Sequence, residues 1–161
     1  MKGLKAAGFE GFRSVRDLSG NAAREIPRHP GVYVVLRASK IAPRFRRKSA
    51  AFHFKGRDPT LPLAHLKSRW VSGAIILYVG KAGTATGKAT LCRRIGNYLH
   101  SGLPRKSSHW GGRAIWQLRD STTLQIAWLV TLGREAREKE MSLLADFKNM
   151  YQVLPFANGS R

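Results

Sequence analysis

The carboxylate of Glu140 lies among apolar positions in a segment that is otherwise typical of an amphipathic helix, residues 134 to about 150. At 100° per residue, Leu144 lies about 40° and Phe147 about 20° from Glu140 around the axis. A carboxylate on an apolar face is seldom buried unless it is paired or binds a metal. Two interpretations stay open: a buried ion pair, for which Arg94 is a candidate partner, and a ligand for a hard divalent cation such as Mg²⁺.

A second helix is predicted to begin at Leu91, and its arginines differ in position. Arg93 is expected to face solvent, whereas Arg94 falls at the border of the buried face. A guanidinium at such a border needs an anionic partner, and a phosphate suits its forked geometry. The apolar positions that define this face are Leu91, Ile95, Tyr98 and Leu99.

Three strands are predicted to position these helices. Residues 31–36 follow Pro30 as a β-branched and aromatic run, which indicates a central strand buried on both faces. Residues 75–79 form a second apolar run that breaks at Gly80, and residues 124–130 are rich in strand-forming residues. A short helix is expected near residues 10–18, and residues 114–118 fit either a short helix or a strand.

A long basic excursion, residues 37–74, separates the first two predicted strands. A loop of this length inside one domain is uncommon unless it is functional or disordered. Aromatic residues are interleaved with the cations, which suits either stacking on bases or anchoring of the loop: Phe45, Phe52, Phe54 and Trp70. The side chains expected to contact nucleic acid are Arg44, Arg46, Arg47, Lys48, Lys55 and Arg57.

Length and charge point to one domain with a polyanionic partner. The 161 residues suit a single domain, with residues 1–30 as an amino-terminal extension. Lysine and arginine number 29 against 9 acidic residues, giving a net charge of +20. Such a charge favours nucleic acid as the partner, DNA first and RNA also open. The lone Cys92 suits a reducing cytoplasm, and no apolar run reaches the ~20 residues that a membrane span needs.

Five elements in chain order resemble the GIY-YIG nucleases. These are Gly31-Val32-Tyr33, Tyr78-Val79-Gly80-Lys81, Arg94, Glu140 and Asn158. Tyr98, one turn after Arg94, makes the match most similar to the repair-nuclease version of the family. The chain departs from the family's pattern in the long insertion between the two strand motifs.

The resemblance implies an α/β (α+β) fold in which helices flank a small sheet of three antiparallel strands. It also implies hydrolysis of a DNA phosphodiester with one divalent metal, Mg²⁺ or Mn²⁺. Tyr33 would be the general base, helped by Tyr78, and Arg94 would hold the scissile phosphate. Glu140 would bind the metal and Asn158 would brace the site. Lys81 would be a supporting donor, and together with the metal it would lower the pKa of the tyrosine base.

Two other classes of function remain in view. The first is a non-catalytic nucleic-acid-binding protein on the same scaffold, and the second is a basic ribosome-associated or structural RNA protein. Both account for the charge of +20. Neither needs a carboxylate on an apolar helix face, so Glu140 favours the nuclease interpretation.

Overall fold

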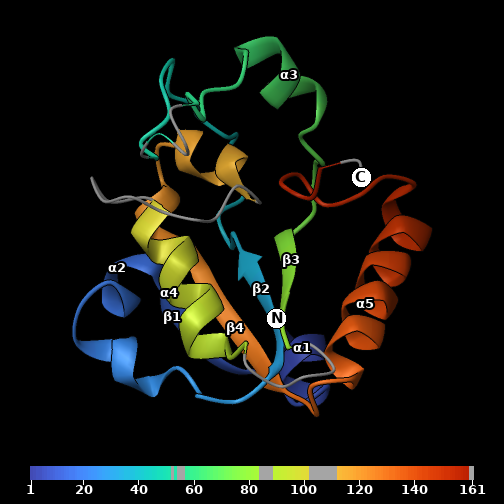
Figure 1. Cartoon of the computed structure of the whole chain (residues 1–161). Coiled ribbons are helices and arrows are strands. Elements are labelled where there is room, and N and C mark those ends of the chain that lie inside the picture. The colour runs from blue at the N-terminus through green and yellow to red at the C-terminus, as the bar shows by residue number, and fades with distance from the viewer. Residues whose placement is uncertain (52, 54–56, 84–88, 102–111, 160–161) are drawn as a thin grey trace.

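The computed structural model describes residues 1–51, 53, 57–83, 89–101 and 112–159. Its centre is a four-stranded antiparallel sheet in the order β1-β4-β2-β3, so the class is α+β (Figure 1). The strands are β1 (Glu10–Ser14), β2 (Gly31–Leu36), β3 (Ile76–Ala82) and β4 (Gln125–Val130). Three of them match the predicted strands, and β1 is an additional strand that makes the predicted count of three wrong.

The helix expected near residues 10–18 is therefore only partly present, as α2 (Val15–Leu18). Residues 10–14 instead pair with β4, and the register shifts between Gly11 and Arg13. Gly11 and Phe12 both have positive φ, 88° and 52°, which a right-handed helix does not allow. A Cβ at Gly11 would lie 2.5 Å from the Trp128 ring, so this strand is fixed by long-range packing rather than by local preference.

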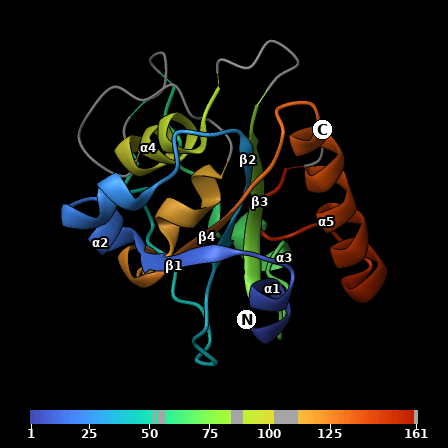
Figure 2. The ribbon, with the colours of Figure 1, turned by 90° about the horizontal axis from the view of Figure 1, so that it is seen from below.

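Two long helices cover opposite faces of the sheet. On one face, α4 (Leu91–Ser101) packs its predicted apolar positions against Tyr33 and Val35 of β2. On the other face, α5 (Glu135–Tyr151) brings Leu143 and Leu144 against the alternate β2 residues. Figure 2 shows the edge strand β3 between these two helices. Residues near β3 can therefore receive side chains from both layers.

Short helices complete the described chain. They are α1 (Lys2–Ala6), η1 (Asn21–Glu25), α3 (Leu63–Ser68), η2 (Arg113–Gln117) and η3 (Ser121–Thr123). Residues 113–117 are thus a 3₁₀ helix, and Leu118 directly after it forms a β-bridge with Phe45. The basic excursion is consequently attached to the body of the domain at this bridge. None of the helices in the described residues has the length and apolarity that crossing a membrane requires.

Candidate active site

Tyr33 and Gly80 are cross-strand partners on β2 and β3. A Cβ at position 80 would lie 2.6 Å from Cζ and 2.7 Å from the hydroxyl oxygen of Tyr33. The tyrosine ring therefore lies on the glycine backbone, where no side chain fits. Tyr33 is fully buried, and no described residue gives its hydroxyl a hydrogen bond of good geometry.

Aromatic rings extend from Tyr33 in a row beneath α4. The Tyr33 and Tyr78 rings are 5.9 Å apart between centroids, and Tyr78 is stacked on Tyr98 at 6.3 Å. Tyr98 in turn contacts the ring of Trp116 at 5.1 Å. The two tyrosines of the strand motifs and the tyrosine of α4 are thus one contiguous cluster. Trp116, at the end of this row, is buried as well.

Burial raises the pKa of Tyr33 well above its usual value, and the neighbouring Tyr78 adds to the rise. The nearby guanidinium of Arg94 acts in the opposite direction and lowers this pKa. The family resemblance implied that Lys81 would lower the pKa of Tyr33. Among the described residues, the cation that lowers this pKa is Arg94 instead. Tyr33 is therefore protonated at neutral pH in this state of the protein.

Arg94 is exposed on α4, so its predicted place at the border of the buried face is wrong. Although the residue is exposed, its guanidinium still lowers the pKa of the buried Tyr33. The position of α4 is fixed at its start, where Leu91 N–H donates to His29 O at 2.8 Å and Cys92 N–H to Pro27 O at 2.9 Å. Gly31 permits this approach, because a Cβ there would lie 2.9 Å from Leu91 Cδ1 and 2.1 Å from Leu129 O.

Glu140 is buried in α5, 7% exposed, as its place on the apolar face predicts. Because Arg94 is exposed, it does not form a buried ion pair with Glu140. Lys81 pairs in register with Val32, whose side chain packs on the α5 side of the sheet. Cross-strand partners share a face, so Lys81 and Glu140 lie on the side opposite to Tyr33. The candidate site therefore straddles the edge strand β3.

Asn158 holds the outer edge of β3. Its side-chain Oδ1 accepts from Val79 N–H at 2.9 Å, and its Nδ2 donates to Val79 O at 2.8 Å. Next to it, Ala157 N–H donates to Leu77 O at 2.8 Å. At Val79 the carboxamide thus forms the two hydrogen bonds that a neighbouring strand would form. This geometry fits the expected role of Asn158 as a brace.

Arg69 is a residue that the sequence did not single out. Its Nε donates to Phe156 O at 3.1 Å, and its Nη2 donates to Asn158 O. Trp70, next in the chain, packs on the Phe156 ring at 5.2 Å. The basic excursion therefore fixes the carboxyl-terminal tail that braces β3. A pairing across 87 or 89 positions leaves no local pattern in the sequence by which it could be found.

The donor set for a metal is small. Within the described residues no group of three His, Cys, Asp or Glu side chains gathers. One buried carboxylate, Glu140, fits a cation that takes one or two carboxylates and keeps several waters, as Mg²⁺ does. Its burial on α5 is the observation that agrees with such a ligand.

The predicted nucleic-acid contacts lie on the surface as far as they are described. Arg44, Arg46, Arg47, Lys48 and Arg57 are exposed, and Lys55 lies outside the described residues. Phe45, by contrast, is turned inward and packs on Phe156 and Trp70. Of the two predicted roles for Phe45 and Trp70, anchoring is the one that this packing supports.

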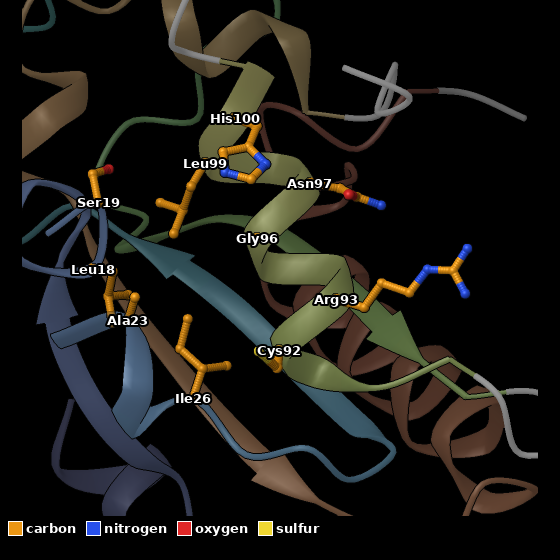
Figure 3. Close-up of a pocket in the computed structure, with 10 residues that line it drawn as sticks. All are labelled: Leu18, Ser19, Ala23, Ile26, Cys92, Arg93, Gly96, Asn97, Leu99 and His100. Atoms are coloured by element: carbon orange, nitrogen blue, oxygen red, sulfur yellow. The ribbon is translucent and has the colours of Figure 1, made fainter. Parts of the chain in front are cut away.

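An apolar pocket of about 560 Å³ lies between α4 and the α2–η1 segment, away from these groups (Figure 3). Leu18, Ile26 and Leu99 line it, and the Arg93 side chain extends away from it. Tyr33, Tyr78, Arg94 and Glu140 are not among its lining residues. The pocket is therefore separate from the candidate active site.

Comparison of the chain with models of protein families, with curated proteins and with solved structures found no match.

Proposed function

We propose that this protein is a metal-dependent endonuclease of the GIY-YIG type that hydrolyses DNA phosphodiester bonds. The observation that carries the proposal is the arrangement around β3. Tyr33 lies on Gly80, contacts Tyr78 and is under the electrostatic influence of Arg94. Asn158 clamps the residue between Tyr78 and Gly80. Four separated parts of the sequence are involved, and a purely structural sheet edge needs no such combination.

In this proposal Arg94 binds the scissile phosphate, because an exposed guanidinium can offer two parallel donors to it. Tyr33 accepts the proton of the attacking water, helped by Tyr78, whose ring lies beside the Tyr33 ring. A divalent cation, Mg²⁺ or Mn²⁺, on Glu140 would supply Lewis-acid polarisation of the phosphate. A reducing cytoplasm is part of the proposal, since Cys92 is the chain's one cysteine.

The raised pKa of Tyr33 sets a condition on this role. A protonated tyrosine cannot accept a proton, so its pKa must fall when substrate and cation arrive. Arg94 already acts in that direction. In this proposal Tyr33 is held in its protonated form in the free protein, and the lower pKa in the loaded site makes the tyrosinate, which can accept the proton, accessible.

A second candidate is a non-catalytic DNA-binding protein on the same scaffold. The complete burial of Tyr33 favours it, because an inaccessible hydroxyl packs as a core group. In that case Glu140 would have a structural role and the cations would bind the DNA backbone.

The two candidates differ in a plasmid cleavage assay. Purified protein is incubated with supercoiled plasmid and Mg²⁺, Mn²⁺ or chelator, beside Glu140→Gln. The matched control is Glu138→Gln, which removes an exposed carboxylate two residues away on the same helix. The nuclease proposal expects metal-dependent nicked or linear product that Glu140→Gln abolishes and Glu138→Gln retains. Binding without cleavage under every metal condition supports the second candidate instead.

A further inference from the structure

Residues 44–50 of the basic excursion are held against the domain by backbone hydrogen bonds that flank one β-bridge; we call this pairing the ladder. Arg46 N–H donates to Gln117 O at 2.7 Å, and Ala50 N–H donates to Trp116 O at 3.1 Å. The side chain of Gln117 is fully buried. Its Oε1 accepts from Leu61 N–H at 2.6 Å, and its Nε2 donates to Leu61 O at 3.0 Å and to Arg46 O at 3.3 Å. Residues 44–50 therefore have a fixed backbone despite lying outside the main sheet.

Two arginines face each other across this ladder. Phe45 and Leu118 form an antiparallel bridge, and the next pair along it is Arg44 and Arg119. Arg119 N–H donates to Arg44 O at 2.9 Å, and both side chains are exposed. Like charges directly opposite one another destabilise a strand pair. An anion bound between the two guanidiniums would remove this repulsion.

Two acidic side chains of the described residues lie near this charge: Asp58 interacts electrostatically with Lys48, and Asp120 follows Arg119 in the chain. The adjacent carboxylate, Asp120, is bound by Arg37 at 2.7 Å between Nε and Oδ2. Arg46, Arg47 and Lys48 are also exposed and add to the same surface. We call this set the cationic ridge: Arg44, Arg46, Arg47, Lys48 and Arg119.

We infer that the cationic ridge is a preformed docking surface for the phosphate backbone of duplex DNA, with Arg44 and Arg119 as its central phosphate-binding pair. The inference rests on the proposed function in taking DNA as the substrate. A surface ordered before binding loses little conformational entropy when it docks. The ridge would hold the duplex at a place separate from the phosphate that Arg94 binds.

The chemistry of the ridge favours duplex backbone over unpaired bases. Binding of single strands relies on exposed aromatic rings on which bases stack. The aromatic residue of the ridge segment, Phe45, points inward to Phe156 and Trp70. The outward groups are cations, which contact phosphates without reading sequence.

The test is equilibrium binding of a fluorescent duplex in chelator, so that no cleavage occurs, over a range of salt concentrations. Arg44→Gln/Arg119→Gln is compared with wild type and with Arg24→Gln/Arg28→Gln. The control removes two exposed arginines, Arg24 in η1 and Arg28 three residues after its end, and Figure 1 shows this segment away from the ridge. Loss of two phosphate contacts should reduce the slope of log affinity against log salt by about 1.8, and weaken binding about 30-fold at 0.15 M salt.

The fold of the ridge variant is checked by thermal unfolding. Its midpoint should equal or exceed that of wild type, since the substitutions relieve like-charge repulsion and keep the backbone hydrogen bonds. Three outcomes would overturn the inference. The salt slope could be unchanged, the control pair could have an equal effect, or affinity could fall only for a single strand of the same length and not for the duplex. Because the assay needs no metal or cleavage, failure of the nuclease proposal leaves this result readable. If the ridge variant binds duplex DNA as wild type does and still cleaves it, the inference about the ridge is wrong and the nuclease proposal stands.

Discussion

The ring of Tyr33 occupies the space in which a side chain at Gly80 would begin, because the two residues are directly opposed on β2 and β3. Position 80 must therefore be glycine, because the Tyr33 ring packs where a larger side chain would lie. This contact holds the Tyr33 ring against the strand that also carries Tyr78.

Gly80→Ala should displace Tyr33. The added methyl would lie 2.7 Å from the hydroxyl oxygen, and overpacking of this kind costs about 1 to 3 kcal/mol of unfolding free energy. Urea unfolding measures the stability, and plasmid cleavage should fall with it. The matched control is Gly96→Ala in α4, where nothing lies within 4 Å of the new methyl. That helix substitution should stabilise by up to about 1 kcal/mol. Equal effects of both substitutions would contradict the packing argument.

The cleavage rate should rise with pH through the neutral range. Burial raises the pKa of Tyr33, so the tyrosinate fraction grows about tenfold per pH unit below that pKa. Single-turnover rates at saturating Mg²⁺ between pH 6.5 and 8.5 measure this dependence. Tyr33→Phe should lack both the activity and the slope. A pH-independent wild-type rate would show that Tyr33 is not the base.

Alkaline conditions should destabilise the fold through its buried tyrosines. The pKa of Tyr98 is raised well above its usual value by burial, and Tyr33 behaves alike. The unfolded chain therefore loses these protons first, near pH 10, and stability falls as pH rises further. Each group contributes up to about 1.4 kcal/mol per pH unit in this window, and nothing below it.

Unfolding free energies measured between pH 9 and 11.5 check this expectation. Tyr98→Phe should flatten the alkaline decline, since one titrating group is gone. Tyr151→Phe, at the partly exposed end of α5, is the control and should decline as wild type does. A decline that Tyr98→Phe leaves unchanged would assign the alkaline loss to other groups.

Arg69→Gln should loosen the tail that braces β3. The substitution removes donors to Phe156 O and Asn158 O, and we expect a loss of about 1 to 2 kcal/mol for these partly exposed charged hydrogen bonds. Cleavage should fall because Asn158 is held less firmly against β3. Duplex affinity in chelator should change little, because in this argument Arg69 does not contact DNA. Lys67→Gln, an exposed cation two residues earlier, is the control for lost charge. A parallel fall in affinity would indicate direct DNA contact by Arg69 instead.

Local patterns were sufficient for the elements that bury a regular face. The run after Pro30 is β2, and the apolar spacing from Leu91 is α4. The same reasoning placed Glu140 on the buried face of α5 because helical period fixes which residues share a side. It failed for Arg94, since the wheel gives an angle and not the depth to which neighbouring elements cover it.

The periodic elements, the burial of Glu140 and the order of the motif residues could thus be predicted from the amino-acid sequence. Tertiary structure alone decided that residues 10–14 form a strand, because their hydrogen bonds go to β4 and their glycine lies beneath Trp128. It also decided that residues 44–50 pair with residues 116–119, with Arg44 opposite Arg119, and that Arg69 holds the tail on β3. These contacts join residues 73 to 118 positions apart in the chain, and periodicity carries information only about neighbours within a few turns.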